Sequence, residues 1–471
     1  MISPRRTLFW AVILLGVLPL CAGLACAALL WWTLPYAPRA VLNAGPNHTL
    51  QGISPDSQFV VTTDVQKDPR SQDTSSVRLW DANTGRQLAR FLSAAHVIES
   101  CEIDSTRKLL FIAEFSPAQV RVIDIESKAE VAALLPSPAE EMSEMQIGGL
   151  HLAPDGRTLA YTVLEGGRAD LNLWDIPTRQ LRATIHSEAN RGLSFHPWAF
   201  SPDGALIATC ESSLAPIPRE VIVVRDTVSG RTVGAFKDFE GSPFFKLTFS
   251  PDSATLAMHS FADVTSPFRS GAEDVTYVWD LKTGRRLLVL DDTVSPIFTE
   301  GGAALHAIAT DRTSGQRAIK RWDLATEAPP QELLSIPRVD RAEFCYLQPP
   351  AGNGIALIER GVSIKPSVLD EVLVWVGLRN NARSHTRSSV TLVDTASWTR
   401  LATLSADSTS LSPDGLTLAV SDSDHKSTRL YDVPPRRPWF RIVGWSALLA
   451  ASVLVACKRL LAKWQLAERD A

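Results

Sequence analysis

FSPDGALIATCESSLAPIPREVIVVRDTVSG, residues 200–230, is the stretch that decides the fold. An apolar run ends at Phe200, a Ser-Pro-Asp-Gly turn follows, and a second apolar run begins at Leu206. After a loop, a β-branched run ends at Arg225-Asp226 before another turn. Proline presets φ, aspartate bonds to its own backbone and glycine tolerates positive φ, so both turns are typical of hairpins. The stretch therefore predicts antiparallel β-structure connected by hairpins.

The same unit recurs along the middle of the chain. Further Pro-Asp turns lie at residues 54–57, 153–156, 250–253 and 412–415. Each of the third strands is expected to end in a dyad whose second residue is aspartate: Trp80-Asp81, Ile123-Asp124, Trp174-Asp175, Arg225-Asp226, Trp279-Asp280, Trp322-Asp323, Val393-Asp394 and Tyr431-Asp432. Recurrence at this spacing predicts an array of similar supersecondary units.

These units resemble the blades of bacterial WD-repeat β-propellers, as in Phe249-Ser250-Pro251-Asp252 to Trp279-Asp280. The resemblance covers residues 39–433 and implies an all-β, closed propeller of four-stranded antiparallel blades. Eight dyads favour eight blades; seven is the alternative, if a weak unit near Asp124 or Asp323 merges with a neighbour. The Gly-His dipeptide of the family is absent. We expect the repeated Trp to pack one blade on the next and the dyad aspartates to form turns.

The last repeat lacks a fourth strand, because the chain after Asp432 runs into an apolar segment. Residues 39–43 precede the first repeat and have the composition of a strand. Since an open ring would expose two sheet edges, we predict that this N-terminal segment completes the last blade. The loops between second and third strands then project from the face opposite the Pro-Asp turns.

Apolar segments flank the repeats at both ends. Residues 8–34 carry no charged side chain and, at ~1.5 Å rise per residue, are long enough for a ~30 Å hydrocarbon core. They predict a transmembrane helix or signal-anchor after a tail at 1–7, with a cleaved signal peptide as the alternative. Residues 442–461 predict a second transmembrane helix before a tail at 462–471, or alternatively a helix that lies in the interface.

Basic residues set the expected orientation. The outer ends of the two apolar segments carry Arg5, Arg6, Lys458, Arg459, Lys463 and Arg469, whereas the ends that face the repeats carry Arg39, Arg436, Arg437 and Arg441. By the positive-inside rule this pattern places both tails in the cytoplasm and the propeller outside it.

Composition and motifs favour binding over catalysis. A net charge of −4 gives no reason to expect a nucleic-acid partner. No GxSxG, HExxH, phosphate-binding loop or CxxC pair is present, so we predict no catalytic residue, no metal site and no cofactor. Arg379, Arg383 and Arg387 concentrate positive charge on one inserted loop and are candidate binding residues for an acidic group.

We therefore expect a membrane-anchored propeller that is no enzyme and serves as a scaffold for protein–protein interaction, with an unknown protein or peptide partner. Propellers also host enzymes, so one alternative is a propeller hydrolase or metal-dependent enzyme with its site at the central channel. A second alternative is a structural envelope protein.

Overall fold

The computed structural model forms two compact units, one of residues 39–434 and one that combines 1–38 with 435–471. The residues that it describes are 13–34, 36–45, 48–66, 74–93, 98–115, 118–135, 145–165, 168–186, 198–213, 219–237, 239, 242–261, 274–326, 328–336, 342–347, 354–364, 385–406, 408–421 and 427–469.

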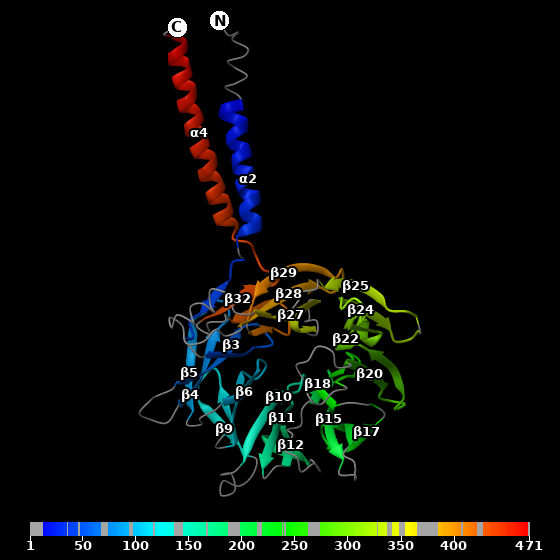
Figure 1. Ribbon diagram of the computed structural model, residues 1–471. Coiled ribbons are helices and arrows are strands. Elements are labelled where there is room, and N and C mark those ends of the chain that lie inside the picture. Colours follow the sequence, from blue (N-terminus) through cyan, green and yellow to red (C-terminus); the bar gives the residue numbers. More distant parts are fainter. Residues whose placement is uncertain are drawn as a thin grey trace, which may run out of the picture. The chain divides into compact units, whose positions relative to one another are not determined.

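The larger unit is a ring of sheets (Figure 1). In the part of the chain that is described, eight antiparallel four-stranded sheets are present, which we number as blades in chain order. The expectation of an eight-bladed all-β propeller is thus confirmed, and the seven-bladed alternative is wrong, because the weak units at Asp124 and Asp323 each form a sheet of their own.

Blades 1 to 4 comprise β2 (His48–Ile53), β3 (Phe59–Gln66), β4 (Thr74–Asp81) and β5 (Gln87–Ser93); β6 (Ile98–Asp104), β7 (Leu109–Glu114), β8 (Gln119–Asp124) and β9 (Glu130–Leu134); β10 (Gln146–Leu152), β11 (Thr158–Glu165), β12 (Arg168–Asp175) and β13 (Gln180–His186); and β14 (Trp198–Phe200), β15 (Leu206–Ser213), β16 (Arg219–Asp226) and β17 (Thr232–Phe236).

Blades 5 to 7 comprise β18 (Ser242–Phe249), β19 (Thr255–Phe261), β20 (Asp274–Asp280) and β21 (Arg286–Asp291); β22 (Thr293–Thr299), β23 (Ala304–Thr310), β24 (Arg317–Asp323) and β25 (Gln331–Ile336), with a 3₁₀ turn η3 (Glu300–Gly302) between β22 and β23; and β26 (Ala342–Leu347), β27 (Ile355–Ile364), β28 (His385–Asp394) and β29 (Thr399–Ser405). Blade 8 combines β1 (Ala40–Leu42) with β30 (Ser408–Leu411), β31 (Thr417–Ser421) and β32 (Thr428–Asp432).

The first strand of each blade lies on the inside of the ring and the fourth on the outside (Figure 1). First strands of neighbouring blades contact one another, as β6 contacts β2 and β10. All eight third strands end at the aspartate of a dyad. Next to the dyad the pairing with the fourth strand shifts register, for example between Leu79 and Trp80. Such a bulge increases the local twist, as the coiled blades of a propeller require.

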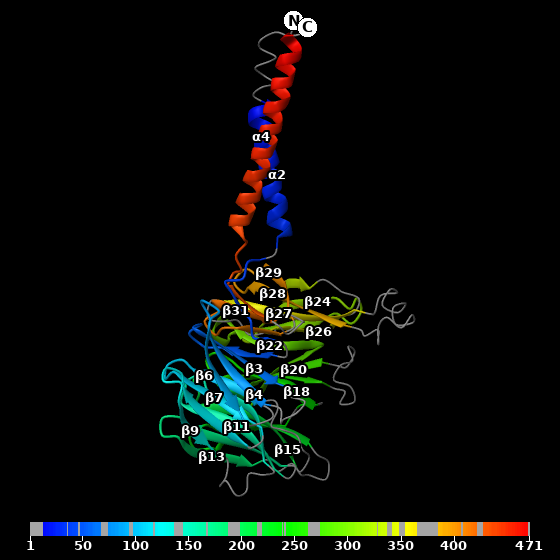
Figure 2. The same ribbon diagram turned by 90° about the vertical axis from the view of Figure 1, so that its left-hand side faces the viewer.

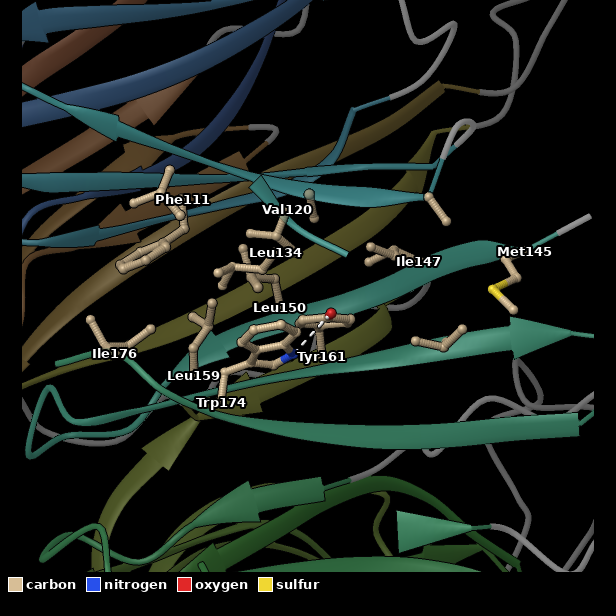
Figure 3. Packing of buried hydrophobic residues seen from close by; sticks show 14 residues of the cluster. Phe111, Val120, Leu134, Met145, Ile147, Leu150, Leu159, Tyr161, Trp174 and Ile176 are labelled. Atoms are coloured by element: carbon tan, nitrogen blue, oxygen red, sulfur yellow. Dashed lines mark hydrogen bonds between the residues drawn. The ribbon is translucent and has the colours of Figure 1, made fainter. Parts of the chain in front are cut away.

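The dyad tryptophans pack between blades, as expected. Trp174 of blade 3 lies in a cluster with Phe111, Val120 and Leu134 of blade 2 (Figure 3). Trp80, Trp279 and Trp322 occupy equivalent clusters against the preceding blade: Trp80 against Leu42 and Leu430, Trp279 against Ile222 and Phe236, and Trp322 against Ala257 and Val278. Each of the four tryptophans is at most 9% exposed. On an area basis, burial of one such side chain stabilises the fold by at most ~4 kcal/mol.

The indole N–H groups find partners although the Gly-His dipeptide is absent. Trp174 Nε1 donates to the hydroxyl of Tyr161 at 3.0 Å, drawn as the dashed line in Figure 3. Trp80 Nε1 donates to Thr62 Oγ1 at 2.9 Å. Because a buried donor without a partner costs about 1–3 kcal/mol, these side chains from the second strand of the same blade stabilise the buried tryptophans.

The predicted closure of the ring is confirmed. Strand β1 pairs with β32 through Ala40↔Leu430, Val41↔Arg429 and Leu42↔Thr428. The guanidinium of Arg39 bonds to Asp432 Oδ1 at 3.0 Å, to the carbonyl of Ala82 at 2.8 Å and to Thr417 Oγ1 at 3.2 Å. Arg39 therefore ties the start of the propeller unit to two residues of blade 8 and to the dyad turn of blade 1.

The smaller unit is a pair of helices. A π-helical turn η1 (Ile13–Val17) leads into α2 (Leu18–Thr33), which contacts α4 (Trp439–Arg469) (Figures 1 and 2). A Cβ on Gly23 would lie 3.3 Å from that of Ala450, so a small residue permits the close approach. Below the helices, Arg437 Nη1 donates to Leu34 O at 2.5 Å and its guanidinium lies 4.1 Å from the ring centre of Tyr36.

Among the described residues one helical segment is long and apolar enough to cross a membrane, Trp439–Lys463, with 25 residues and a mean hydropathy of 1.9. It is longer at its N-terminal end than the expected segment 442–461, because Trp439 and Phe440 already belong to the helix. The N-terminal apolar helix, Leu15–Trp31, is shorter than a full span. A second transmembrane helix at 8–34 therefore stays a prediction, and residues 8–12 lie outside the described part.

Candidate binding face

Two sets of turns gather on one face of the propeller: the first turns, between first and second strands, and the dyad turns, between third and fourth strands. A backbone hydrogen bond joins the two sets in every blade. The residue after the dyad aspartate donates its N–H to a carbonyl just before the second strand: Ala82 to Gln58, Ile125 to Lys108, Ile176 to Arg157, Thr227 to Ala205, Leu281 to Ala254, Leu324 to Ala303, Thr395 to Gly354 and Val433 to Leu416. These bonds fix the two turns of each blade side by side.

The Pro-Asp turns are built by a Ser–Asp pair. In blade 4, Ser201 Oγ donates to Asp203 Oδ1 at 2.5 Å, and the same serine accepts the N–H of Leu206 at 2.8 Å. The carboxylate also accepts the N–H of Ala205 at 3.1 Å. The Ser201 hydroxyl thereby holds the pKa of Asp203 below its ordinary value of 3.8. Four equivalent contacts repeat this pattern in blades 1, 5 and 8 and, through Asp155, partly in blade 3.

The dyad aspartates cap their own turns, as expected. Asp280 Oδ1 accepts the N–H of Thr283 at 2.6 Å and its hydroxyl at 2.8 Å. The backbone N–H of Thr283 is the main reason why the pKa of Asp280 lies below 3.8. Asp81, Asp124, Asp175, Asp226, Asp323 and Asp394 accept backbone N–H groups in the same way. Asp432 instead pairs with Arg39.

Neighbouring first turns touch along much of the ring. Ser57 Oγ of blade 1 donates to Asp414 of blade 8 at 2.7 Å, and Lys108 of blade 2 reaches Asp56 at 3.2 Å. Arg107 of blade 2 donates to the carbonyl of Gly156 of blade 3 at 2.7 Å. Further along, a Cβ on Gly204 would lie 2.5 Å from Asp155 Cγ, so blades 3 and 4 meet at van der Waals distance. The carboxylates on this face are thus engaged in holding the ring.

A second group of polar side chains lies on the inner strands. His151 of β10 has its Nδ1 3.3 Å from Glu102 Oε1 of β6 and its ring 4.7 Å from Trp198 of β14, edge to face. The side chain of His151 is 55% exposed. Trp198 is buried, and its indole N–H has no hydrogen-bond partner among the residues that the structure describes. Blades 2 and 3 therefore present a carboxylate and an exposed imidazole side by side, a pair that can bind a polar ligand group, and the ring of Trp198 of blade 4 packs against the imidazole.

The predicted binding residues fall mostly where nothing can be said of them. Arg379 and Arg383 lie outside the described residues. Arg387 is the third residue of β28 and pairs with Val362, but only its backbone is described. Whether the three gather into one site stays a prediction. Within the described ranges no group of three or more His, Cys, Asp or Glu side chains is arranged to hold a metal ion.

Sequence reasoning missed Glu102, His151 and Trp198, because they are far apart in the chain and belong to no motif. A signal existed in the repeat. Glu102 and His151 both stand two residues before the first position of their turns, Asp104 and Ala153, which pair across the turn with Leu109 and Thr158. Aligning the repeats on the turns would have placed both on the inner strand at the same height.

No family model and no curated protein matches the sequence. Among solved structures, the chain is similar to the computationally designed Ika8 protein, with a TM-score of 0.53 and 14% identity over 84% of this chain and 99% of that one. It is also similar to the Dos1 propeller, with a TM-score of 0.54 and 14% identity over 85% of this chain and 97% of that one. At this identity the likeness is one of fold alone, that of a β-propeller.

Proposed function

We propose that this chain is a propeller of the WD-repeat type that is held at a membrane and acts as a non-catalytic platform for a protein or peptide partner. The observation that carries the proposal is that the repeated aspartates have a structural role in their turns. Those that recur around the ring accept hydrogen bonds from their own turns, so these turn carboxylates serve a rigid surface. A rigid ring that presents loops from many blades suits the recognition of an extended partner.

Anchoring is proposed through both apolar segments. The helical segment Trp439–Lys463 supplies one span by length and composition. The contact of α2 with α4 at Gly23 supports a second span, in which the N-terminal helix crosses the membrane beside α4. Two spans return both tails to one side, and the basic residues that follow the second segment favour the cytoplasm for them, with the propeller outside.

A partner-capture experiment on the full-length protein in its native membrane tests the platform. Photo-crosslinking followed by purification should recover a defined partner from the wild type. The variant with Arg379, Arg383 and Arg387 changed to alanine should lose it, because an acidic contact is removed. A matched control changes Arg157, Arg231 and Arg285, three exposed arginines on the turns of other blades, to alanine, which alters net charge equally but removes positive charge from the turn face.

The comparison of the two variants decides between readings. Loss of the partner in the first variant alone supports the platform with the arginine loop as its contact. Equal loss of the partner in both variants indicates nonspecific attraction by net charge. Retention of the partner in both variants shows that the arginine loop does not contact it. Absence of any crosslinked partner in the wild type contradicts the platform itself.

An enzyme with its site on the inner strands is the second candidate, and the pairing of His151 with Glu102 favours it, because a carboxylate orients an imidazole for general-base chemistry. Assaying the wild type and a His151→Ala variant with chromogenic ester and glycoside substrates tests it. Turnover by the wild type that the variant lacks would replace the platform proposal by this one.

A further inference from the structure

Lys246 and Thr248 stand on one side of β18, the first strand of blade 5. Their neighbours Leu247 and Phe249 point the other way, into the core shared with blade 4. Thr248 occupies the same repeat position as Glu102 and His151, two residues before the turn that begins at Ser250. Lys246 follows one pleat further along the strand, because alternate residues of a strand share a face. Because β18 lies on the inside of the ring (Figure 1), both residues belong to the layer of first strands, which we call the inner wall.

Neither polar group has a partner within the described residues. The hydroxyl of Thr248 is buried and makes no hydrogen bond. The ammonium of Lys246 makes no ion pair there, and the one charge that acts on it is Glu359 of β27 in blade 7. That carboxylate already accepts a hydrogen bond from Thr409 of β30 in blade 8. The inner wall thus holds a cation and a hydroxyl with unused bonding capacity.

The described residues that face Lys246 on the neighbouring strand do not provide it with an ion-pair partner. Lys246 pairs in register with His259, whose Nε2 lies 3.2 Å from Asp274 Oδ1, so this second carboxylate is also engaged elsewhere. Burial lowers the pKa of Lys246 to about 8, which means that the protein stabilises the ammonium poorly by itself. An anion beside it would both neutralise the charge and accept the hydroxyl hydrogen bond.

We propose that Lys246 and Thr248 form a binding site on the inner wall of the ring for one compact oxyanion, a carboxylate or phosphate group carried by a ligand. The ammonium supplies the charge and the Thr248 hydroxyl supplies a directional donor. The site stands apart from the proposed function, because it requires neither the arginine loop nor the membrane. It gives the ring interior a preference for acidic ligands.

Competitive acetylation of the full-length protein in detergent tests the site, with mass spectrometry reading each lysine separately across a pH series. Inorganic phosphate and acetate are the two probes, compared with chloride at equal ionic strength. Lys246 should be acetylated with a midpoint near pH 8 in chloride, and one of the two anions should protect it and move the midpoint upward. The anion that protects identifies the ligand group as phosphate or carboxylate.

Two variants and one internal reference sharpen the outcome. Thr248→Val should weaken anion protection about three- to ten-fold, the size of one hydrogen bond. Thr49→Val, on the exposed side of first strand β2, is the matched control and should leave protection unchanged. The exposed Lys282 reports general effects of salt. Protection of Lys246 and Lys282 alike, protection by neither anion, or full protection in Thr248→Val would each overturn the site.

Discussion

Closure of the ring by a three-residue strand can be tested with two neighbouring residues. In β1, Leu42 is fully buried in the cluster that joins blades 8 and 1, whereas Val41 on the same strand is 41% exposed. Leu42→Ala removes a buried isobutyl group and leaves a cavity, which costs about 2–5 kcal/mol. Val41→Ala removes a half-exposed group and should cost less than ~1 kcal/mol.

The size of the thermal effect follows from the size of the propeller. Unfolding entropy is about 2.1 cal/mol/K per residue, so a unit of ~400 residues has ~0.8 kcal/mol/K and a loss of ~3 kcal/mol lowers Tm by roughly 4 °C. Differential scanning fluorimetry of the full chain in detergent should show this shift for Leu42→Ala and a shift near zero for Val41→Ala.

Hydrogen exchange locates the change. If β1 holds the ring closed, Leu42→Ala should speed amide hydrogen exchange in β32, which pairs with β1, and in β31, which pairs with β32. Amide exchange in blade 4, which is four blades away from blade 8, should keep its rates. Equal Tm shifts for the two variants, or faster exchange spread evenly over all blades, would refute the reasoning that β1 is the closing strand.

Three further predictions concern the turn face and the topology. Gly204→Ala should cost about 2–4 kcal/mol in chemical unfolding, since its φ is +72° and the new Cβ would meet Asp155, whereas Gly284→Ala, with φ +70° and open space, should cost about 1 kcal/mol; equal costs would contradict the close approach. Because the folded pKa of Asp203 lies below 3.8, the carboxylate stabilises the fold above that pH, and this effect is lost as pH falls through the folded pKa. When Tm is measured from pH 6 to 3, it should therefore drop less steeply below pH ~4 in Asp203→Asn than in the wild type. Identical slopes for the two proteins would rule this out. In intact cells, a Lys282→Cys variant should react with a membrane-impermeant maleimide, and reaction only after lysis would place the propeller in the cytoplasm.

Much of the fold could be predicted because the local structure of each repeat depends on residues within that repeat. The Ser-Pro-Asp turn and the dyad turn fix two hairpins per blade through contacts within a few residues, as Ser201 and Asp203 show. Units near Asp124, Asp323 and Asp394 kept enough of that chemistry to be counted, and each forms a complete sheet. Even the closure could be inferred, since the last repeat lacked one strand and the N-terminal segment supplied one.

The candidate site could not be predicted in the same way. Glu102, His151 and Trp198 come from three blades, and no local pattern encodes a contact between residues about fifty positions apart. Among the described residues, the surroundings of Lys246 depend on which side chains of distant blades come near it: Glu359 of blade 7 acts on its charge and also accepts a hydrogen bond from Thr409 of blade 8. These are consequences of ring closure, not of the repeat.

The sequence by itself therefore determined the repeat, the closing strand and the two apolar ends, because hairpin turns and long apolar runs depend on neighbouring residues; it favoured eight blades over seven, and the structure settled that number. Only the tertiary structure decided that Arg39 links both ends of the propeller unit and that a threonine and a tyrosine accept the indole N–H groups of Trp80 and Trp174. It also decided that the buried hydroxyl of Thr248 has no partner among the described residues. Each of these depends on where closed, twisted sheets bring distant side chains, and such distances are set by packing across blades.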